Sequence, residues 1–320
     1  MSITPSTTGY ADVNGLHLYY ETYGSGAPLV LLHGGMLTID LNFASLIPTL
    51  AQTHTVIGVE MQGHGRTANI DREITYANLA TDIVALLDYL GIERAAVLGH
   101  SMGGGVALEL AVNHPDRVSA IVPISASVSK DGMHPDLLDP STFETSSIMP
   151  TAQDFADFKG AYERLSPHPE QFDAFLMSLS GMDSDFAGWS DEQLAGISCP
   201  VLIVQGDNDF TTVPHAGVML AKIQNSTLAV IPATTHMQVT RRDTILLPVL
   251  EQFFAAHPGV LPAGSAGGRP AAYPEAHGRR PVLRRDREVH LADGCGRARR
   301  PVGDRLSRRA GGADPGCGER

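Results

Sequence analysis

One short stretch of this chain places a serine at the junction of a strand and a helix. Residues 99–103 read Gly-His-Ser-Met-Gly, so Ser101 has a glycine two residues before it and another two residues after it. The apolar run 95–98 is typical of a buried strand, and residues 102–113 have a helical pattern. Glycines at this spacing permit a sharp turn that exposes the serine hydroxyl at the carboxyl end of a sheet. The stretch therefore predicts a nucleophilic Ser101.

Candidates for a base and an acid follow in the second half of the chain. A serine hydroxyl needs a base to take its proton and an acid to orient that base. A buried strand is predicted over 201–205, with Asp207 and Asp209 directly after it, and another over 227–231, followed by a loop that ends at His236. Because ligands bind at the carboxyl ends of parallel strands, these side chains are expected near the serine.

Strand and helix patterns alternate along most of the chain. This alternation predicts an α/β fold in which helices cover both faces of a mostly parallel sheet. The dipeptide Asn14-Gly15 between apolar alternations indicates an opening hairpin. The other predicted elements are strands at 28–32, 55–59 and 118–124, and helices at 41–52, 75–90 and 245–256.

Taken together, the motifs resemble those of the α/β-hydrolase superfamily, in its branch of capped esterases, perhydrolases and carbon–carbon bond hydrolases. The resemblance covers about residues 8–257. The family more often has Asp and Ser where this chain has Glu60 and Thr67, which look like parts of the loop architecture. Five stretches carry the resemblance: LLHGG (31–35), EMQGHGRT (60–67), GHSMGGG (99–105), LIVQGDND (202–209) and ATTH (233–236).

The resemblance implies a role for each residue of a Ser-Asp-His triad. Ser101 is the implied nucleophile, Asp209 the acid and His236 the base, with Asp207 as the alternative acid. A serine at this position argues against the haloalkane dehalogenases and epoxide hydrolases of the superfamily, which use a carboxylate there. Neither a metal nor an organic cofactor is expected.

The resemblance also implies an oxyanion hole made of backbone N–H groups. Its donors would be Gly35 and Met102, with Met36 as the alternative to Gly35, because the His-Gly loop can be aligned in two ways. Three histidines of the same glycine-rich loops are expected to be structural and to hydrogen-bond nearby backbone: His33, His64 and His100.

About 75 residues without a strand pattern separate Ser125 from Val201, which is too long for a plain connection. In the resembling family this position holds a helical cap over the active site. Helices are predicted here at 151–165, 168–181 and 190–197. The expected organisation is a hydrolase core over 1–126 and 200–257, a helical cap over 127–199 and a tail over 258–320.

The tail differs in composition from the rest of the chain. It holds 13 arginines, no lysine, 12 glycines and 7 prolines, a composition that cannot bury enough apolar surface to fold. It is therefore predicted to be disordered, with an out-of-frame or fused extension and a basic interaction arm as alternatives. The chain as a whole carries a formal charge of −12, and its acidic body disfavours nucleic acid and anionic membranes as partners.

The predicted activity is hydrolysis of a small or medium apolar carboxylic ester through an acyl-enzyme. Carbon–carbon bond hydrolysis, perhydrolysis with the same triad, and a ligand receptor on a hydrolase scaffold are the alternatives. Residues 1–9 lack a basic cluster and an apolar run, and no stretch approaches 18 apolar residues, so a cytoplasmic location is expected. A small-molecule ester is the expected partner, and the oligomeric state stays open.

Overall fold

Eight strands form one mixed sheet in the computed structural model, which describes residues 3–258. The strand order is β1-β2-β4-β3-β5-β6-β7-β8. The pairs β1–β2 and β2–β4 are antiparallel and all the others are parallel, so the sheet is mostly parallel, as predicted. The strands are β1 (Thr7–Val13), β2 (Leu16–Tyr23), β3 (Ala27–Leu32), β4 (His54–Glu60), β5 (Ala95–His100), β6 (Val118–Ile124), β7 (Val201–Asn208) and β8 (Ser226–Thr235).

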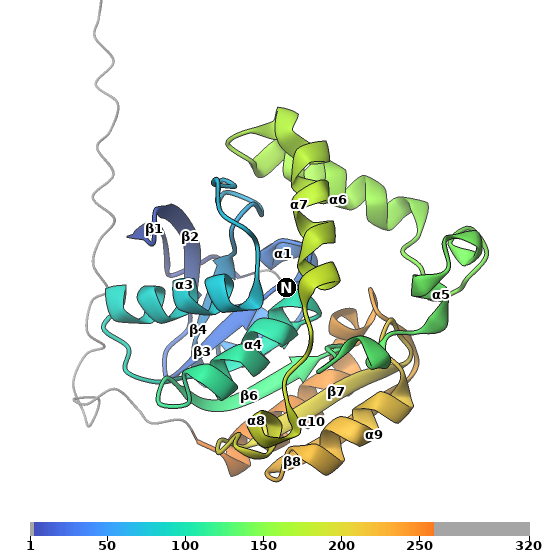
Figure 1. Ribbon diagram of the computed structural model, residues 1–320. Helices are drawn as coiled ribbons and strands as arrows, with labels where there is room; N and C mark the ends of the chain where they lie inside the picture. Colours follow the sequence, from blue (N-terminus) through green and yellow to red (C-terminus); the bar gives the residue numbers. More distant parts are fainter. Residues whose placement is uncertain (1–2, 259–320) are drawn as a thin grey trace, which may run out of the picture. The chain divides into compact units, whose positions relative to one another are not determined.

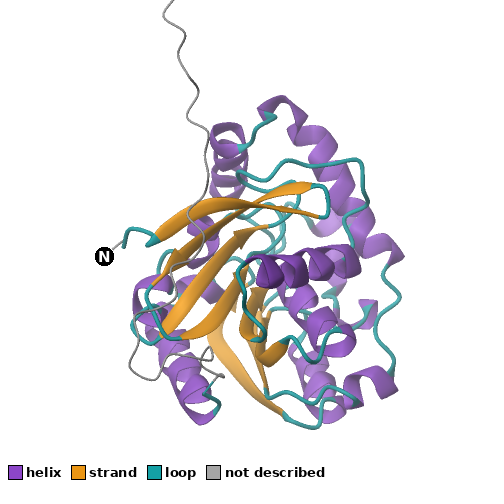
Figure 2. Ribbon diagram, turned by 90° about the vertical axis from the view of Figure 1, so that its left-hand side faces the viewer, coloured by secondary structure: helices purple, strands orange, loops and turns teal. Residues whose placement is uncertain are grey.

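Helices lie on both faces of this twisted sheet (Figure 2). None of those within residues 3–258 has the length and the apolar character that a membrane span requires. The predicted tail, apart from Pro258, lies outside the described residues. The α-helices are α1 (Ile39–Phe43), α2 (Ile47–Leu50), α3 (Tyr76–Tyr89), α4 (Met102–Asn113), α5 (Pro135–Leu138), α6 (Ala152–Leu165), α7 (Phe172–Asp185), α8 (Asp191–Ala195), α9 (Val213–Lys222) and α10 (Asp243–Ala256).

The alternation of strand side chains builds two apolar layers. In β3, Val30 and Leu32 belong to the layer that includes residues of α3, α4 and α9, whereas Leu29 and Leu31 belong to the layer with α1, α2 and α10. All four of these side chains are fully buried. A strand that is apolar at every position is therefore covered on both faces, as expected for the interior of a parallel sheet.

Several elements differ from the sequence-based expectation. The single helix predicted over 41–52 is two short helices, α1 and α2, because Pro48 has no N–H to continue the helical hydrogen bonds. The predicted strand 227–231 extends to Thr235, so the expected loop before His236 is mostly strand. Helix α9 was not predicted, and neither was the short helix α5.

Between β6 and β7 the chain forms α5 to α8 and no strand of the sheet. Helices α6 and α7 lie together at the top of the view in Figure 1. The N-terminus of α6 is closed by a capping box in which Thr151 and Asp154 satisfy each other's backbone N–H groups. The Asp154 carboxylate also accepts a hydrogen bond of 3.1 Å from Arg241, which ties α6 to the segment before α10.

Candidate active site

Ser101 occupies the turn that joins β5 to α4. Its φ of 53° lies in the left-handed region, which costs a non-glycine residue about 1–3 kcal/mol. Neither flanking glycine has room for a side chain. A Cβ on Gly99 would lie 2.0 Å from the carbonyl oxygen of Gly103, and a Cβ on Gly103 would lie 2.0 Å from that of Leu32. The close approach of helix to strands thus depends on both glycines, and the turn holds Ser101 at the carboxyl end of β5.

Asp209 and His236 follow the carboxyl ends of β7 and β8, and they are hydrogen-bonded to each other. His236 Nδ1 lies 2.6 Å from Asp209 Oδ1, and both residues are buried. Asp209 also accepts hydrogen bonds from the Ser125 hydroxyl (2.5 Å) and from the backbone N–H groups of Gly206 (3.2 Å) and Phe210 (2.6 Å). Burial alone raises the pKa of Asp209, but the charge of His236 and the hydrogen bonds from His236 and Ser125 hold that pKa below its usual value.

The other candidate acid, Asp207, has different partners. Its two carboxylate oxygens accept the backbone N–H groups of Ala233 and Thr234, each at 2.9 Å. These bonds, the one from Thr234 foremost, lower the pKa of Asp207. Ala233 has a φ of 51°, so Asp207 stabilises an irregular stretch of β8 just before His236. The geometry brings Asp209 to the imidazole and leaves Asp207 on the backbone.

The two candidate oxyanion donors from the His-Gly loop also differ. The N–H of Met36 donates to His64 Nε2 at 3.1 Å and is therefore occupied. Among residues 3–258, the N–H of Gly35 donates to no backbone or side-chain acceptor. Met102 is the first residue of α4, where the N–H has no acceptor within the helix. The arrangement leaves Gly35 and Met102 available to an oxyanion, and it excludes Met36 in this conformation.

His33 and His64 bind backbone groups, as expected. His33 Nδ1 lies 2.8 Å from the Gly34 carbonyl oxygen, and His33 Nε2 accepts the Met61 N–H at 3.1 Å. His64 Nδ1 lies 2.9 Å from the carbonyl oxygen of Gln62. Burial lowers the pKa of His33 to about 4 and that of His64 well below its ordinary value. Both rings are therefore neutral near pH 7, and they hold the loops that carry Gly35 and Met36.

His100 reaches further along the chain than expected. Its Nδ1 lies 3.2 Å from Asn42 Oδ1, and its Nε2 lies 3.1 Å from the carbonyl oxygen of His236. Asn42 Oδ1 also accepts the Gly34 N–H at 2.8 Å. Burial lowers the pKa of His100 to about 3, so the ring is neutral and carries one N–H between two acceptors. The ring therefore donates to only one of the two acceptors, and it lies between Asn42 and the backbone of His236.

A cavity of about 670 Å³ adjoins these groups, and we call it the catalytic cavity. Ser101 and His236 both line it, although no hydrogen bond joins their side chains among the described residues. Contacts of this kind are often long in ligand-free enzymes and tighten when substrate binds. Among the side chains that the structure describes, no group of three His, Cys, Asp or Glu residues could hold a metal ion. The segment between β6 and β7, which we call the insertion, supplies much of the apolar wall. Its residues there include Met133, Leu137, Leu138, Phe158, Leu176 and Leu179.

A family model described as the alpha/beta hydrolase fold matches residues 27–170, which include β3, the turn at Ser101 and the first part of the insertion. The strand order, the turn at Ser101 and the positions of Asp209 and His236 after β7 and β8 agree with this match. The chain has the α/β-hydrolase fold.

Similar proteins include enzymes of several activities. The chain is 39% identical over 117 residues to the dihydrolipoyllysine-residue acetyltransferase component of the acetoin cleaving system of Cupriavidus necator, a match that covers 36% of this chain and 31% of that protein. It is 25% identical over 275 residues to the uncharacterized hydrolase YugF of Bacillus subtilis, covering 75% of this chain and 95% of YugF. Among solved structures, Est816, described as an N-acyl homoserine lactone degrading enzyme, has a TM-score of 0.59 and 26% identity, with 76% of this chain and 99% of Est816 covered.

Two residues at this α/β-hydrolase site were not anticipated from the sequence. The ring of Phe210 stacks on that of His236, with centroids 3.9 Å apart and an interplanar angle of 12°. The Ser125 hydroxyl donates a hydrogen bond to Asp209. A signal existed for Ser125, because it follows β6, which pairs with β7 and therefore ends beside it. The stacking of Phe210 had no signal in the sequence.

Proposed function

We propose that this protein hydrolyses a carboxylic ester with an apolar acyl part through an acyl-serine intermediate. The observation that carries the proposal is the hydrogen bond of 2.6 Å between His236 Nδ1 and Asp209. A neutral imidazole that donates a hydrogen bond from Nδ1 has a lone pair at Nε2, which can accept the proton of a serine hydroxyl. The free N–H groups of Gly35 and Met102 complete the set of groups that acyl transfer needs.

The reaction proceeds in two halves. Ser101 Oγ attacks the ester carbonyl carbon while His236 Nε2 takes the hydroxyl proton, and the oxyanion accepts hydrogen bonds from Gly35 and Met102. The tetrahedral intermediate breaks its bond to the alcohol oxygen, which leaves with the proton from His236. Water then attacks the acyl-serine with the same base, and the carboxylic acid leaves as Ser101 regains its proton. Asp209 orients His236 and stabilises its cation throughout.

The apolar wall of the catalytic cavity supports an apolar acyl group. Phe158, Leu176 and Leu179 are aromatic or aliphatic, and Met133 is flexible enough to adapt to different chains. The likeness to Est816 favours a lactone, which is an internal ester, as one form of the substrate. Ring opening of an acyl lactone would use the same attack, with the alcohol remaining on the product.

A substrate panel tests this function. Purified protein is assayed with p-nitrophenyl esters of increasing chain length, with an acyl homoserine lactone, with a vinylogous diketone, and with peroxide plus acetate. We expect turnover of the esters, and Ser101→Ala should lower kcat by about 10⁴–10⁶-fold while leaving the fold intact. Circular dichroism checks the fold. Wild-type rates in Ser101→Ala, or turnover of the diketone or peroxide alone, would contradict the proposal.

A further inference from the structure

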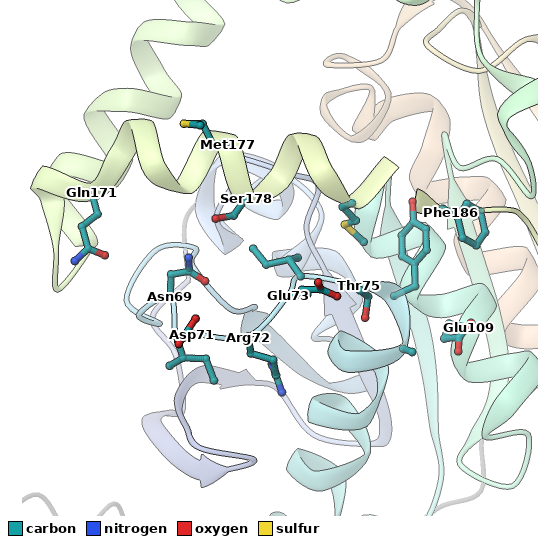
Figure 3. Close-up of a pocket in the computed structure, with 15 residues that line it drawn as sticks. Asn69, Asp71, Arg72, Glu73, Thr75, Glu109, Gln171, Met177, Ser178 and Phe186 are labelled. Carbon is teal, nitrogen blue, oxygen red and sulfur yellow. The ribbon is translucent and has the colours of Figure 1, made fainter. Parts of the chain in front are cut away.

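A second cavity, of about 870 Å³, lies beside the catalytic cavity, and we call it the flank cavity. Figure 3 shows it between α7 and the segment before α3. Asn69, Asp71 and Glu73 lie on that segment, Gln171 lies at the N-terminal end of α7, and Ser178 lies on α7. Its walls are therefore rich in amide, hydroxyl and carboxylate groups. The catalytic cavity is walled mainly by apolar side chains, so the two cavities differ in chemistry.

Three side chains line both cavities: Tyr76, Met182 and Phe186. They form the partition between the two spaces. The ring of Tyr76 meets that of Phe186 edge-on, with centroids 4.9 Å apart. Gly105 makes room for this arrangement, because a Cβ there would lie 2.2 Å from Tyr76 Cε1. Because the same residues line both cavities, a change in the rotamers of Met182 and Phe186 would alter both spaces at once.

The partition is anchored on one side. The ring of Trp189 lies 4.6 Å from that of Phe186 and 5.7 Å from that of Tyr76, and its Nε1 donates to Glu109 at 2.8 Å. Phe186 itself stands at the C-terminal end of α7 and is only half-buried. Met182 is an unbranched side chain that changes shape readily. The movable members of the partition are therefore Met182 and Phe186.

The charge of the flank cavity is acidic on balance. Asp71 and Glu73 are exposed within its lining, whereas the guanidinium of Arg72 is bound to the Asp82 carboxylate at 2.6 Å and to the amide oxygen of Gln62. An anionic group placed here would meet carboxylates whose neighbouring cation is already paired. Hydroxyl and amino groups would instead find acceptors.

We propose that the flank cavity binds the alcohol part of the substrate, and that this alcohol carries hydroxyl or amino groups and no carboxylate. The proposal rests on the ester hydrolysis proposed above, and it names the class of ester. The acyl chain occupies the catalytic cavity, the scissile carbonyl lies at Ser101, and the alcohol passes between Met182 and Phe186 into the flank cavity.

Three butanoates that share one acyl group provide the test: the ethyl ester, the monoglyceryl ester and the anionic carboxymethyl ester. We expect kcat/KM to fall in the order glyceryl, ethyl, carboxymethyl, with the first two about tenfold apart, the value of one to two additional hydrogen bonds. Ser178→Phe fills the flank cavity from an exposed helix position and should bring the ratio of glyceryl to ethyl rates close to one. Ala174→Phe, also exposed on α7 and outside both cavities, should keep the wild-type ratio.

A binding experiment separates this proposal from the proposed chemistry. Trp189 is the only tryptophan of the chain, and it touches the partition. In the Ser101→Ala background, titration with glyceryl butanoate should change Trp189 emission, with a dissociation constant about tenfold lower than that of the ethyl ester. Adding Ser178→Phe should remove that difference.

The outcomes are distinct. If no ester is turned over but the titration shows preferential binding that Ser178→Phe removes, the hydrolytic proposal fails and the assignment of the flank cavity stands. If the three esters react within twofold of one another, or if Ser178→Phe slows the ethyl and glyceryl esters equally, the flank cavity is a solvent passage only. Either result would overturn the assignment.

Discussion

The carboxyl edge of the sheet and the insertion above it are constructed in different ways. At the edge, Asp209 is 2% exposed and accepts four hydrogen bonds, and His236 is 4% exposed with a ring stacked on one face. In the insertion, by contrast, Leu138 is 69% exposed and Met177 75% exposed. The helices of the insertion contribute side chains to cavities, whereas the edge contributes groups whose positions are fixed by several partners each.

This difference separates the chemistry of the site from its choice of substrate. Groups held by many partners keep one geometry, which acid–base and nucleophilic catalysis need. Side chains that project from loosely covered helices can change without disturbing those groups. Substitutions at the edge should therefore change kcat strongly, and substitutions in the insertion should change the preference among substrates.

Among the substitutions that test this comparison, the largest loss of kcat is expected at Asp209, the proposed acid. Asp209→Asn should lower kcat by about 10⁴-fold, because the imidazole loses both its preferred tautomer and the stabilisation of its cation. Asp207→Asn, two residues away, is the matched control and should cost far less, since Asp207 binds only backbone N–H groups. Steady-state kinetics on a p-nitrophenyl ester measures both. Equal losses would mean that the acid has been assigned to the wrong residue.

A smaller effect is expected at the ring that stacks on the base. Phe210→Leu should lower kcat by up to about 10²-fold, the effect of a misplaced catalytic group. Phe210→Tyr keeps an aromatic ring on the imidazole of His236 and should preserve the rate. A wild-type rate in Phe210→Leu would show that the stacked ring does not help to position His236.

In the insertion, Leu179 offers a test of substrate choice. A side chain on Gly35 would lie 3.9 Å from Leu179 Cδ1, so Leu179 covers the candidate oxyanion hole. Leu179→Ala should shift the preferred acyl chain to greater length and change the ratio of kcat/KM between long and short esters by about tenfold, with little change in the best kcat. Phe143→Ala, exposed and outside both cavities, is the control. A uniform drop for all chain lengths would break the separation of chemistry from selectivity.

The smallest expected effect is on the free energy of unfolding, which should depend on pH because histidines are buried at this edge of the sheet. The pKa of His33 falls to about 4 and that of His100 to about 3 in the folded state, both by burial. Above the unfolded pKa near 6.5 both rings are neutral in the folded and the unfolded state, and the free energy of unfolding is at its full value. As the pH falls toward 4, only the unfolded state binds these protons, so the free energy of unfolding drops by about 2 kcal/mol for each histidine at pH 5. Urea unfolding at pH 7 and pH 5 measures the loss.

Glu60 changes the free energy of unfolding with pH in the opposite direction, and it serves as the control for that experiment. Burial raises its pKa to about 7, so its stabilisation is present below its unfolded value near 4.5 and is lost as the pH rises through 7. Glu60→Gln should therefore make the loss of stability between pH 7 and pH 5 steeper. A slope unchanged by the substitution would show that Glu60 does not titrate in this range.

Much of the fold and part of the site could be predicted because their signals are local. The apolar run 95–98 and the glycines on either side of Ser101 predict strand, turn and helix without reference to any distant residue. The break between α1 and α2 also has a local signal, Pro48. Helix α9 has one too, because its N-cap Thr212 is followed two residues later by a proline.

By itself, then, the sequence determined the alternation of strands and helices, the turn at Ser101, and the presence of an aspartate and a histidine after the last two strands. Tertiary structure decided which partners meet: Asp209 rather than Asp207 at the imidazole, Gly35 rather than Met36 with a free N–H, and Phe210 on the ring of His236. The physical reason is the distance along the chain over which each interaction acts. Backbone propensity and steric fit act over a few neighbouring residues, whereas a hydrogen bond or a stacked ring depends on the positions, to within tenths of an ångström, of atoms from distant segments.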